Sequence, residues 1–330
     1  MIVPLPSLSV RCSNGRGRFL WSNMKPYLSW QKQVKLMSDR GLIIEDEAEC
    51  IRFLTTVNYY RFSGYARYFQ IAPHEDNNDF CPGTSFNKIR EIYYADEKLR
   101  TNLLKPLSCV ELMLRSHVAH IIGKEYGPYH SYLEEDFYVN PNNRPMIRDS
   151  CLHDIERSKE RHILHYRNDA GGNHDFDELP VWSAVEAWSF GTLSKVIEYG
   201  GQGSLADSVA ASICIAKGGF ASRIKALVYL RNRCAHYGRL WHHSVVDAGP
   251  TPNNVRKKAK RIAGQFGNRS VVDVIASLDD ICVRGKVMDT SGKLLNPELP
   301  KMVKQYKSNS DFWCGLVDPK SPKDHKAHQS

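Results

Sequence analysis

The 330-residue sequence lacks the long apolar runs that mark membrane proteins. No stretch reaches 18 uncharged apolar residues, so we expect no membrane-spanning helix. The N-terminal lead has only a short apolar run, which contains Pro4 and Pro6, and its basic residues follow that run. A secretory signal has the opposite order. We therefore expect a cytoplasmic protein that does not associate with membranes.

Other absences exclude classes of enzyme. The nine cysteines are odd in number and scattered, with no C-x-x-C, which argues against a disulfide framework and a thiolate zinc site. There is no phosphate-cradling Gly loop, no G-x-S-x-G elbow and no carboxylate cluster suited to two metals. An ATPase, a serine hydrolase and a metal nuclease are therefore not indicated, and we expect no cofactor.

The residues that are present indicate a globular protein with a basic end. Apolar residues make up 42% and aromatic residues 10% of the chain, which is ample for a buried core. Most of the net charge of +9 lies in residues 251–330, where 15 Lys and Arg face 8 Asp and Glu. A cationic face attracts RNA or DNA. A solvated, solubilising tail explains the same charge equally well.

Hydrophobic periodicity predicts an all-α fold. A long helix from Phe86 or Lys88 to Ile122, bent or broken near Pro106 and ended by Gly123, carries apolar residues at three- and four-residue steps. No convincing period-two alternation precedes Val245, so we expect no strand there. Further helices are expected near residues 27–41, 49–64, 146–166, 179–200, 204–216 and 220–237.

These patterns divide the chain into segments. We expect a poorly ordered lead over 1–25, an N-terminal helical segment over 26–85 and a larger helical domain over 86–250. A basic C-terminal helical extension follows over 251–318, and a disordered tail over 319–330.

One arginine interrupts an apolar stripe. On a helical wheel that starts at Phe220, Arg231 lies at about 20°, between Leu227 and Ile224. A guanidinium stays charged, and burying it without a partner costs on the order of several kcal/mol. One interpretation therefore pairs Arg231 with a core carboxylate such as Glu186, or places it at the seam of a dimer.

The other interpretation is a catalytic site. Arginine and histidine suit phosphodiester chemistry, because the cation stabilises a phosphorane and imidazole transfers a proton near neutral pH. His236 lies about 140° round the helix from Arg231, whereas Asn232 lies one turn before His236 and can orient its imidazole. Arg231 and His236 converge only if the helix loosens near Cys234, or if two copies of the motif meet, which favours a homodimer.

Four pieces of the sequence carry a resemblance. They are "VNYYRFSGYARYF" (57–69), "YADEKLRTNLLKPLSCVELMLRSHVAH" (94–120), "LPVWSAVEAWSFGTLSKV" (179–196) and "LRNRCAHYGRLW" (230–241). The last contains Arg231 and His236 at the spacing of the R-x4–6-H motif of the HEPN superfamily. In this order the four pieces resemble the Abi-like abortive-infection proteins of bacteria, of the AbiD/AbiF type, over about residues 25–245.

The resemblance implies a HEPN-like helical bundle over 86–250. Many HEPN proteins are metal-independent endoribonucleases, so it implies a toxic RNase of phage defence that leaves a 2′,3′-cyclic phosphate, with Arg231, Asn232 and His236 as its catalytic residues. The alternative is a non-catalytic HEPN protein that senses, or is held by, a structured companion RNA. A third interpretation is a toxin that an antitoxin protein neutralises.

Four further residues are candidates to flank this site. "RSHVAH" repeats the R-x4-H spacing with Arg115 and His120 on opposite flanks of their helix, and Glu111 lies one turn before Arg115. We interpret Glu111 and Arg115 as a structural ion pair, or as an edge of the same cleft if the two helices pack together. His242 stands where the family pattern commonly has Asn, and is either a polar contact or exposed.

Two segments are candidates for RNA binding. Arg61 and Tyr65 belong to a mixture of aromatic and cationic residues that suits unpaired bases, although a helix end wedged into the core explains it as well. The basic C-terminal helix offers a grip through Arg256, Lys257, Lys258, Lys260 and Arg261.

Two further groups favour structural roles. Residues His153, His162, His165 and His174 include an H-x-x-H, but no companion ligand has zinc spacing, which favours surface or packing roles. Trp182 and Trp188, which flank Glu186, are expected in the core.

Overall fold

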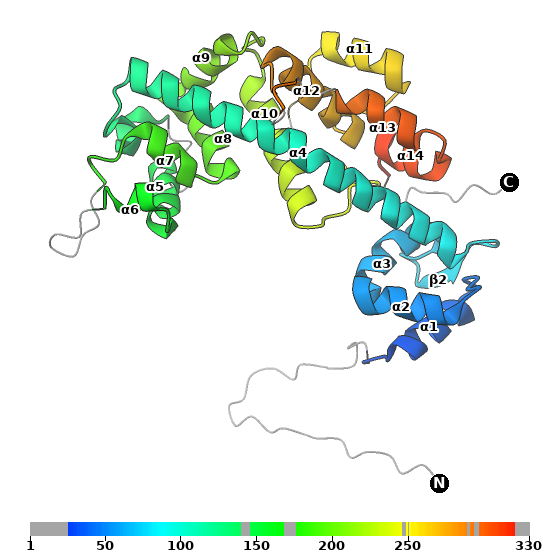
Figure 1. Cartoon of the computed structure of the whole chain (residues 1–330). Coiled ribbons are helices and arrows are strands. Elements are labelled where there is room, and N and C mark those ends of the chain that lie inside the picture. Colours follow the sequence, from blue (N-terminus) through cyan, green and yellow to red (C-terminus); the bar gives the residue numbers. More distant parts are fainter. Residues whose placement is uncertain are drawn as a thin grey trace, which may run out of the picture.

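The structure is a computed structural model that describes residues 26–139, 146–167, 176–245, 249, 251–288, 291–293 and 297–320. These residues form helices α1 to α14 with one two-stranded sheet, which confirms the predicted all-α class (Figure 1). The predicted lead, 1–25, and most of the predicted tail lie outside the described residues. None of the described helices combines the length and apolarity that a membrane crossing requires.

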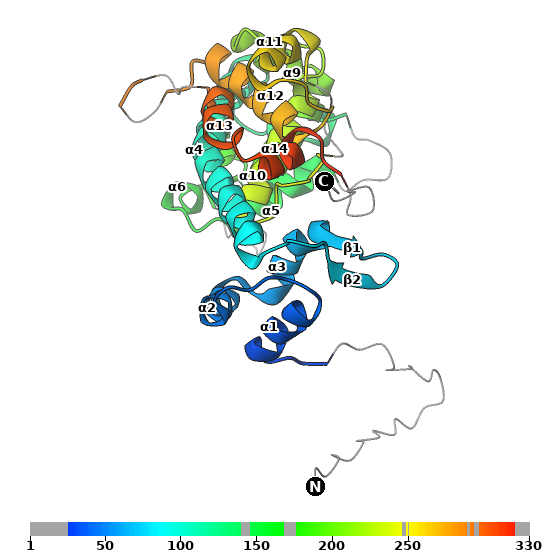
Figure 2. The ribbon, with the colours of Figure 1, turned by 90° about the vertical axis from the view of Figure 1, so that its right-hand side faces the viewer.

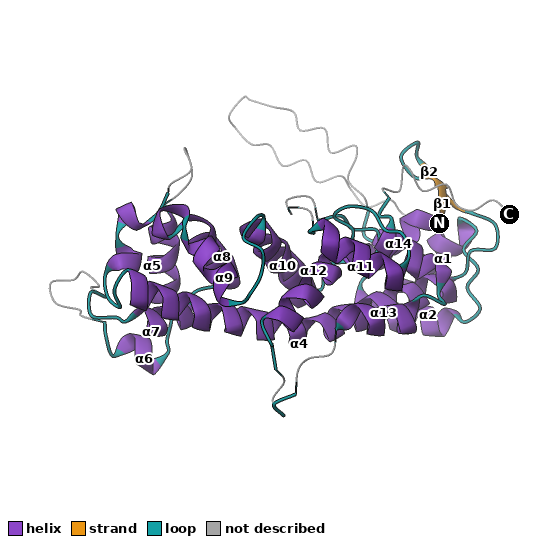
Figure 3. Cartoon of the chain, turned by 90° about the horizontal axis from the view of Figure 1, so that it is seen from above, coloured by secondary structure: helices purple, strands orange, loops and turns teal. Residues whose placement is uncertain are grey.

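Helix α4 (Phe86–Glu125) organises the molecule and runs along its length (Figure 3). Its 40 residues span about 60 Å. It passes through Pro106 and ends two residues beyond Gly123, so the predicted stop at Gly123 is wrong. A helical glycine costs only about 1 kcal/mol relative to alanine, and Gly123 packs against Val181. Tertiary contact therefore carries the helix past it.

The N-terminal segment packs at one end of α4 (Figure 2). Side chains cap the starts of its α-helices. The elements are α1 (Trp30–Asp39), α2 (Glu47–Val57), α3 (Tyr59–Ala66), η2 (Arg67–Phe69), β1 (Gln70–Ala72) and β2 (Asn77–Phe80). The strands pair antiparallel, with Gln70 opposite Phe80. Their presence corrects the expectation of no strand before Val245, because strands of three and four residues are too short to show a period.

The middle of the chain contains more and shorter helices than predicted. The predicted helix over 146–166 is interrupted after Arg157, and the one over 179–200 is interrupted at Trp188. There the Ser189 side chain accepts a hydrogen bond from the Thr192 N–H and starts a new helix. The elements are η3 (Ser131–Leu133), η4 (Glu135–Phe137), α5 (Ile147–Arg157), α6 (Arg161–Leu164), α7 (Val181–Ala187), α8 (Phe190–Tyr199), η6 (Gly201–Gly203), α9 (Leu205–Ser212) and α10 (Phe220–Ala235).

The C-terminal helices belong to the same hydrophobic core as the rest of the chain. They are α11 (Asn253–Ala263), α12 (Val271–Arg284), α13 (Glu298–Tyr306) and α14 (Ser310–Val317). Helix α12 packs against α4 and α10. Buried Arg223 of α10 donates to Ser277 at 2.8 Å and pairs with Asp280 at 2.8 Å. The basic C-terminal segment therefore docks on α10, the helix that carries the Arg-His motif.

Candidate active site

Arg231 lies on α10 and faces α4 and α8. Its Nη2 is 3.3 Å from Glu111 Oε2, and its guanidinium lies 5.4 Å from the ring centre of Phe190. The expected anionic partner therefore exists, but it is Glu111. Glu186, named as the example of a core carboxylate, is exposed on α7, so that choice was wrong.

Glu111 serves two arginines at once. Arg115 Nη2 donates to Glu111 Oε1 at 2.8 Å, which confirms the predicted i, i+4 pair. The Arg115 guanidinium also donates to the carbonyls of Val185 and, at 2.7 Å, Trp188. Because one carboxylate faces two guanidiniums, the cluster keeps one positive charge.

The two arginines differ in how fully their donors are used. Arg115 is 9% exposed and makes three hydrogen bonds at its two terminal nitrogens. The Arg231 side chain is 23% exposed, its contacts to Glu111 are 3.3 and 3.5 Å long, and its buried Nε has no hydrogen-bond partner. A buried N–H without a partner is costly. Arg231 is thus the more exposed and more loosely held of the two guanidiniums, and the one that an anion can reach.

His236 lies just beyond the end of α10. The helix ends at Ala235, and His236 caps it with φ −98° and ψ 19°, its N–H donating to the Asn232 carbonyl at 2.9 Å. The regular i, i−4 hydrogen bond therefore continues up to His236, and the loosening near Cys234 that convergence of Arg231 and His236 within one chain would require is not observed in this described stretch. The His236 side chain is exposed. Between these described residues, the predicted side-chain hydrogen bond from Asn232 to His236 is not formed.

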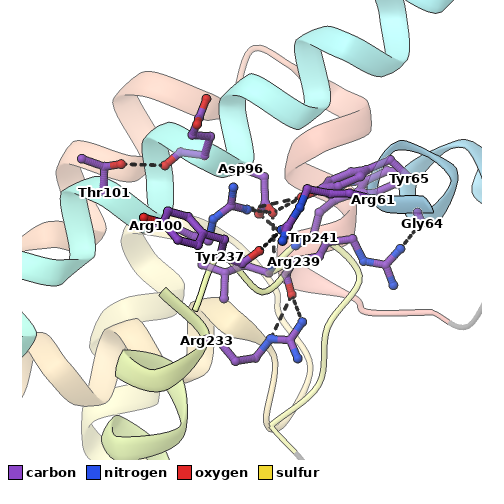
Figure 4. A network of polar contacts seen from close by, with 12 residues as sticks. Arg61, Gly64, Tyr65, Asp96, Arg100, Thr101, Arg233, Tyr237, Arg239 and Trp241 are labelled. Atoms are coloured by element: carbon purple, nitrogen blue, oxygen red, sulfur yellow. Dashed lines mark hydrogen bonds and ion pairs between the residues drawn. The ribbon is translucent and has the colours of Figure 1, made fainter. Parts of the chain in front are cut away.

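A buried carboxylate fixes the segment that follows His236 (Figure 4). Asp96 of α4 is fully buried and accepts hydrogen bonds from the Tyr65 hydroxyl at 2.6 Å and Arg100 Nη1 at 2.5 Å. It also accepts from the backbone N–H groups of Leu240, at 3.1 Å, and Trp241, at 3.0 Å. Burial and the adjacent Asp96 raise the pKa of the Tyr65 hydroxyl well above its usual value. The hydroxyl therefore stays protonated and donates.

Three arginines also hold the same segment (Figure 4). Arg233 donates to the Arg239 carbonyl through Nε at 3.1 Å and Nη2 at 2.5 Å. Arg239 donates to the Gly64 carbonyl, and Arg61 to the Tyr237 carbonyl. Tyr237 has a positive φ of 57°, which is uncommon for a residue with a side chain. These contacts hold the chain in that turn directly after His236.

The two candidate RNA-binding residues of α3, Tyr65 and Arg61, differ in their exposure to solvent. Tyr65 is 2% exposed, so its ring cannot stack on a base, and the alternative interpretation of a helix end in the core is correct. Arg61 is exposed and contacts the residue after His236. The signal for burial was available in the sequence: Tyr65 follows Phe62 at helical spacing, whereas exposed Tyr60 does not.

His242 and His243 are both held by the protein. His242 is 5% exposed, stacks on Tyr68 at 4.4 Å between ring centres, and accepts from the Lys320 N–H through Nδ1 at 3.2 Å. Of the two interpretations of His242, a polar contact or an exposed side chain, the polar contact is correct. Burial, with Arg233 and Arg239 nearby, lowers the pKa of His243 to about 4. His243 is therefore neutral near pH 7, which the sequence did not indicate.

Some cationic side chains of the basic helix α11 are exposed, and others contact residues of the protein. Lys257, Lys258 and Arg261 are exposed. Arg256 is paired with buried Asp273 at 3.1 Å, and the Lys260 ammonium lies 5.8 Å from the ring centre of Phe266. Arg256 therefore has a structural partner, and its role as an RNA contact stays a prediction.

His120 and Trp182 lie at a cavity beside Arg115. The cavity has a volume of about 380 Å³ and is also lined by Glu186 and Val185. Trp182 is 55% exposed, so its expected place in the core was wrong, whereas Trp188 is 1% exposed and confirms the expectation. The sequence cue for Trp182 was its position in the first turn of α7, one residue after the start of the helix.

The histidine-rich segment makes ordinary polar and ring contacts. His162 Nδ1 lies 2.8 Å from the Ser183 hydroxyl, and His165 packs edge-on against Tyr166. His174 lies outside the described residues. In the described part of the chain, no three His, Cys, Asp or Glu side chains gather as a metal site would need.

The fold and site define an all-α protein with an Arg-x4-His motif where a packed helix meets a fixed turn. The profile of the family described as Abi-like protein matches residues 52–242, and the chain belongs to this family. Comparison with curated proteins finds no significant match, and neither does comparison with solved structures.

All four sequence pieces that carried the resemblance lie inside the matched range. The structure brings them together around α4: the first contributes Tyr65, the second Asp96 and Glu111, and the third Phe190. The fourth contributes Arg231 and the turn after it. Helices α11 to α14 lie beyond the match.

Glu111 contacts Arg115 more closely than Arg231, and this difference leads to a testable prediction. A double-mutant cycle should give a coupling free energy of about 1 kcal/mol or more between Glu111 and Arg115, and a smaller one between Glu111 and Arg231, because the second contact is longer. Glu111→Gln, Arg115→Met and Arg231→Met, with the two double variants, are compared by urea unfolding. A larger coupling at Arg231 would contradict this assignment.

Proposed function

We propose that this protein is a metal-independent endoribonuclease of a bacterial abortive-infection system that defends against phage. It is a HEPN-superfamily protein of the AbiD/AbiF type and acts in the cytoplasm. The family name supports the defence role. The observation that carries the activity is the placement, five residues apart at the end of α10, of a partly exposed and loosely held guanidinium, Arg231, and an exposed imidazole, His236, on a fixed turn.

The chemistry needs only the RNA and these side chains. The RNA 2′-OH attacks the adjacent phosphorus and the P–O5′ bond breaks, which leaves a 2′,3′-cyclic phosphate and a 5′-OH. His236 accepts the 2′-OH proton, and in a homodimer His236 of the partner subunit donates a proton to the departing 5′ oxygen. Arg231 stabilises the charge on the phosphorane, and Asn232 turns toward His236 when RNA binds.

Glu111 prepares the site for an anion. It holds the Arg231 side chain against Phe190 while leaving the cluster with one positive charge. A phosphate can then bind Arg231 through two parallel N–H donors, a stronger geometry than the long contact with Glu111. The remaining charge attracts RNA to this point, and Arg61 beside Tyr237 adds a second exposed cation close to His236.

A second candidate function is RNA binding without cleavage. It is favoured by the contact between Arg231 and Glu111, and by the exposed cations Lys257, Lys258 and Arg261 on α11. In that case a structured companion RNA, or an antitoxin protein, is the partner, and the protein senses or is held by it. The same purified protein distinguishes the two functions.

The test is cleavage of a short RNA by the full-length protein. We expect cleavage to continue in EDTA, to yield 2′,3′-cyclic phosphate ends, and to stop when the nucleotide before the cut carries 2′-deoxyribose, because the nucleophile is then missing. Arg231→Ala should remove cleavage and keep binding, whereas Lys225→Ala, an exposed cation on the same helix, should cleave normally. Loss of cleavage in EDTA, or cutting of the 2′-deoxy substrate, would contradict the mechanism.

A further inference from the structure

The cavity beside Arg115 has an unusual lining for a surface pocket. Its volume of about 380 Å³ is at the lower end of the range for small-molecule sites. One side presents the indole of Trp182, which is 55% exposed. The other sides present His120 of α4 and Glu186 of α7, both exposed.

A second aromatic ring extends this surface. Tyr129 is 46% exposed, and its ring centre lies 6.4 Å from that of Trp182 at an angle of 60°. Two large rings on one surface leave apolar area in water that a flat ligand would cover. Aromatic side chains placed in this way stack on unpaired nucleobases, and each stack contributes to affinity whatever the base.

The cavity is linked to Arg231 by direct contacts. Arg115 lines the cavity, and its guanidinium shares Glu111 with Arg231. Arg115 also donates to the carbonyl of Val185, which lines the cavity as well. The cavity and the guanidinium proposed to bind the phosphate therefore lie on either side of one Glu111–Arg115 pair.

We propose that this cavity is a nucleobase subsite for an unpaired base of the RNA strand bound at Arg231. The subsite rests on the proposed function, because that function supplies the strand. The base stacks on Trp182, and Glu186 and His120 contact its edge. The substrate is thus single-stranded at this position, since a paired base is not available to enter the cavity.

The polar groups select the base by its hydrogen-bonding edge. An ionised carboxylate only accepts hydrogen bonds, so Glu186 favours bases with an exocyclic amino group, such as cytosine, whose N4 amino group is a known partner of glutamate. Uracil carries a carbonyl oxygen in place of that amino group and offers only its N3–H as a donor, so it binds the carboxylate less well. The subsite therefore favours adenine, cytosine or guanine over uracil.

Binding to a cleavage-deficient protein tests the subsite without relying on catalysis. Fluorescently labelled single strands of oligo(C) and oligo(U) are titrated with full-length His236→Ala protein and followed by anisotropy. Adding Trp182→Ala should weaken oligo(C) binding by about 5- to 150-fold, while Trp182→Phe keeps most of the affinity. Trp30→Ala, which removes a 49% exposed tryptophan on α1, is the matched control and should change affinity less than about twofold.

Selectivity gives a second, independent readout. Oligo(C) should bind more tightly than oligo(U), and Glu186→Gln should reduce that preference by roughly tenfold. Glu156→Gln, an exposed glutamate on α5, should leave it unchanged. Equal binding of both strands by the protein with Glu186 intact would overturn the assignment of Glu186 as the reader of the base edge.

The outcomes separate the subsite from the proposed function. Trp182-dependent binding by a wild-type protein that cuts no RNA would support the subsite and contradict the endoribonuclease. Normal cleavage and binding by Trp182→Ala would overturn the subsite alone. Loss of self-association in Trp182→Ala, seen by sedimentation with RNA binding unchanged, would also overturn it, because a second copy of the chain would then cover the indole.

Discussion

RNA cleavage by the His236→Ala protein should be about 100- to 10,000-fold slower than cleavage by wild type, with little change in stability. The rate falls because a positioned general acid or base contributes a factor of this size. Stability is kept because the His236 side chain is exposed and lies beyond the last turn of α10. Single-turnover cleavage of labelled RNA measures the rate, and urea unfolding measures the stability.

His74→Ala is the matched control for this experiment. His74 is exposed in the turn between β1 and β2, far along the chain from the motif, so its removal should leave the rate unchanged. Binding of RNA should persist in His236→Ala, because the exposed cations that attract the strand, Arg61 among them, remain. Wild-type rates in His236→Ala would rule out this histidine as the proton-transfer group and would favour the non-cleaving RNA-binding function.

Replacement of Asp96 by alanine should destabilise the protein by about 3–5 kcal/mol. Arg100, 3% exposed, would lose the carboxylate that it pairs with at 2.5 Å and would remain as an unpaired buried charge. The backbone N–H groups of Leu240 and Trp241 would lose their acceptor as well. Since native domains are stable by only about 5–15 kcal/mol, a large part of the folded population should be lost on mild heating or in low urea.

Two comparisons show whether the effect comes from this network. Glu97→Ala removes the exposed neighbouring carboxylate and should change the unfolding free energy by less than about 0.5 kcal/mol. Tyr65→Phe removes one of the four donors to Asp96 and should cost about 1 kcal/mol. If Asp96→Ala unfolded at the same urea concentration as Glu97→Ala, the buried network would not be what fixes the turn after His236.

The position of Arg231 shows which structural features hydrophobic periodicity can predict and which it cannot. The wheel indicated a guanidinium on an apolar stripe, and hence an anionic partner, because the hydrophobic period is a local property of the chain. The helical wheel does not indicate which carboxylate pairs with Arg231. Glu111 lies 120 residues away along the chain, and only the packing of α10 against α4 brings it within 3.3 Å.

Tyr65 and Trp182 show that the burial of an aromatic residue in a short helix is difficult to predict from sequence. Both are aromatic residues in short helices. The residues around Tyr65 left RNA contact and burial open, whereas Trp182 was expected in the core. Tyr65 is 2% exposed and Trp182 is 55% exposed, so burial is correct for the first and wrong for the second. Helices α3 and α7 have only 8 and 7 residues, so the spacing of Tyr65 from Phe62 and the place of Trp182 in a first turn are short cues. The helices packed against α3 and α7 decide which ring reaches water.

The sequence by itself determined the all-α class, the long apolar stripe of α4, the Glu111–Arg115 pair and the order of the family motifs, since each depends on neighbours within one or two helical turns or on composition. Only the tertiary structure decided that Glu111 also meets Arg231 and that buried Asp96 holds the turn after His236. It also placed the exposed indole of Trp182 at the rim of a cavity. These features join residues that are distant in sequence, and their distances are set by how helices pack against α4.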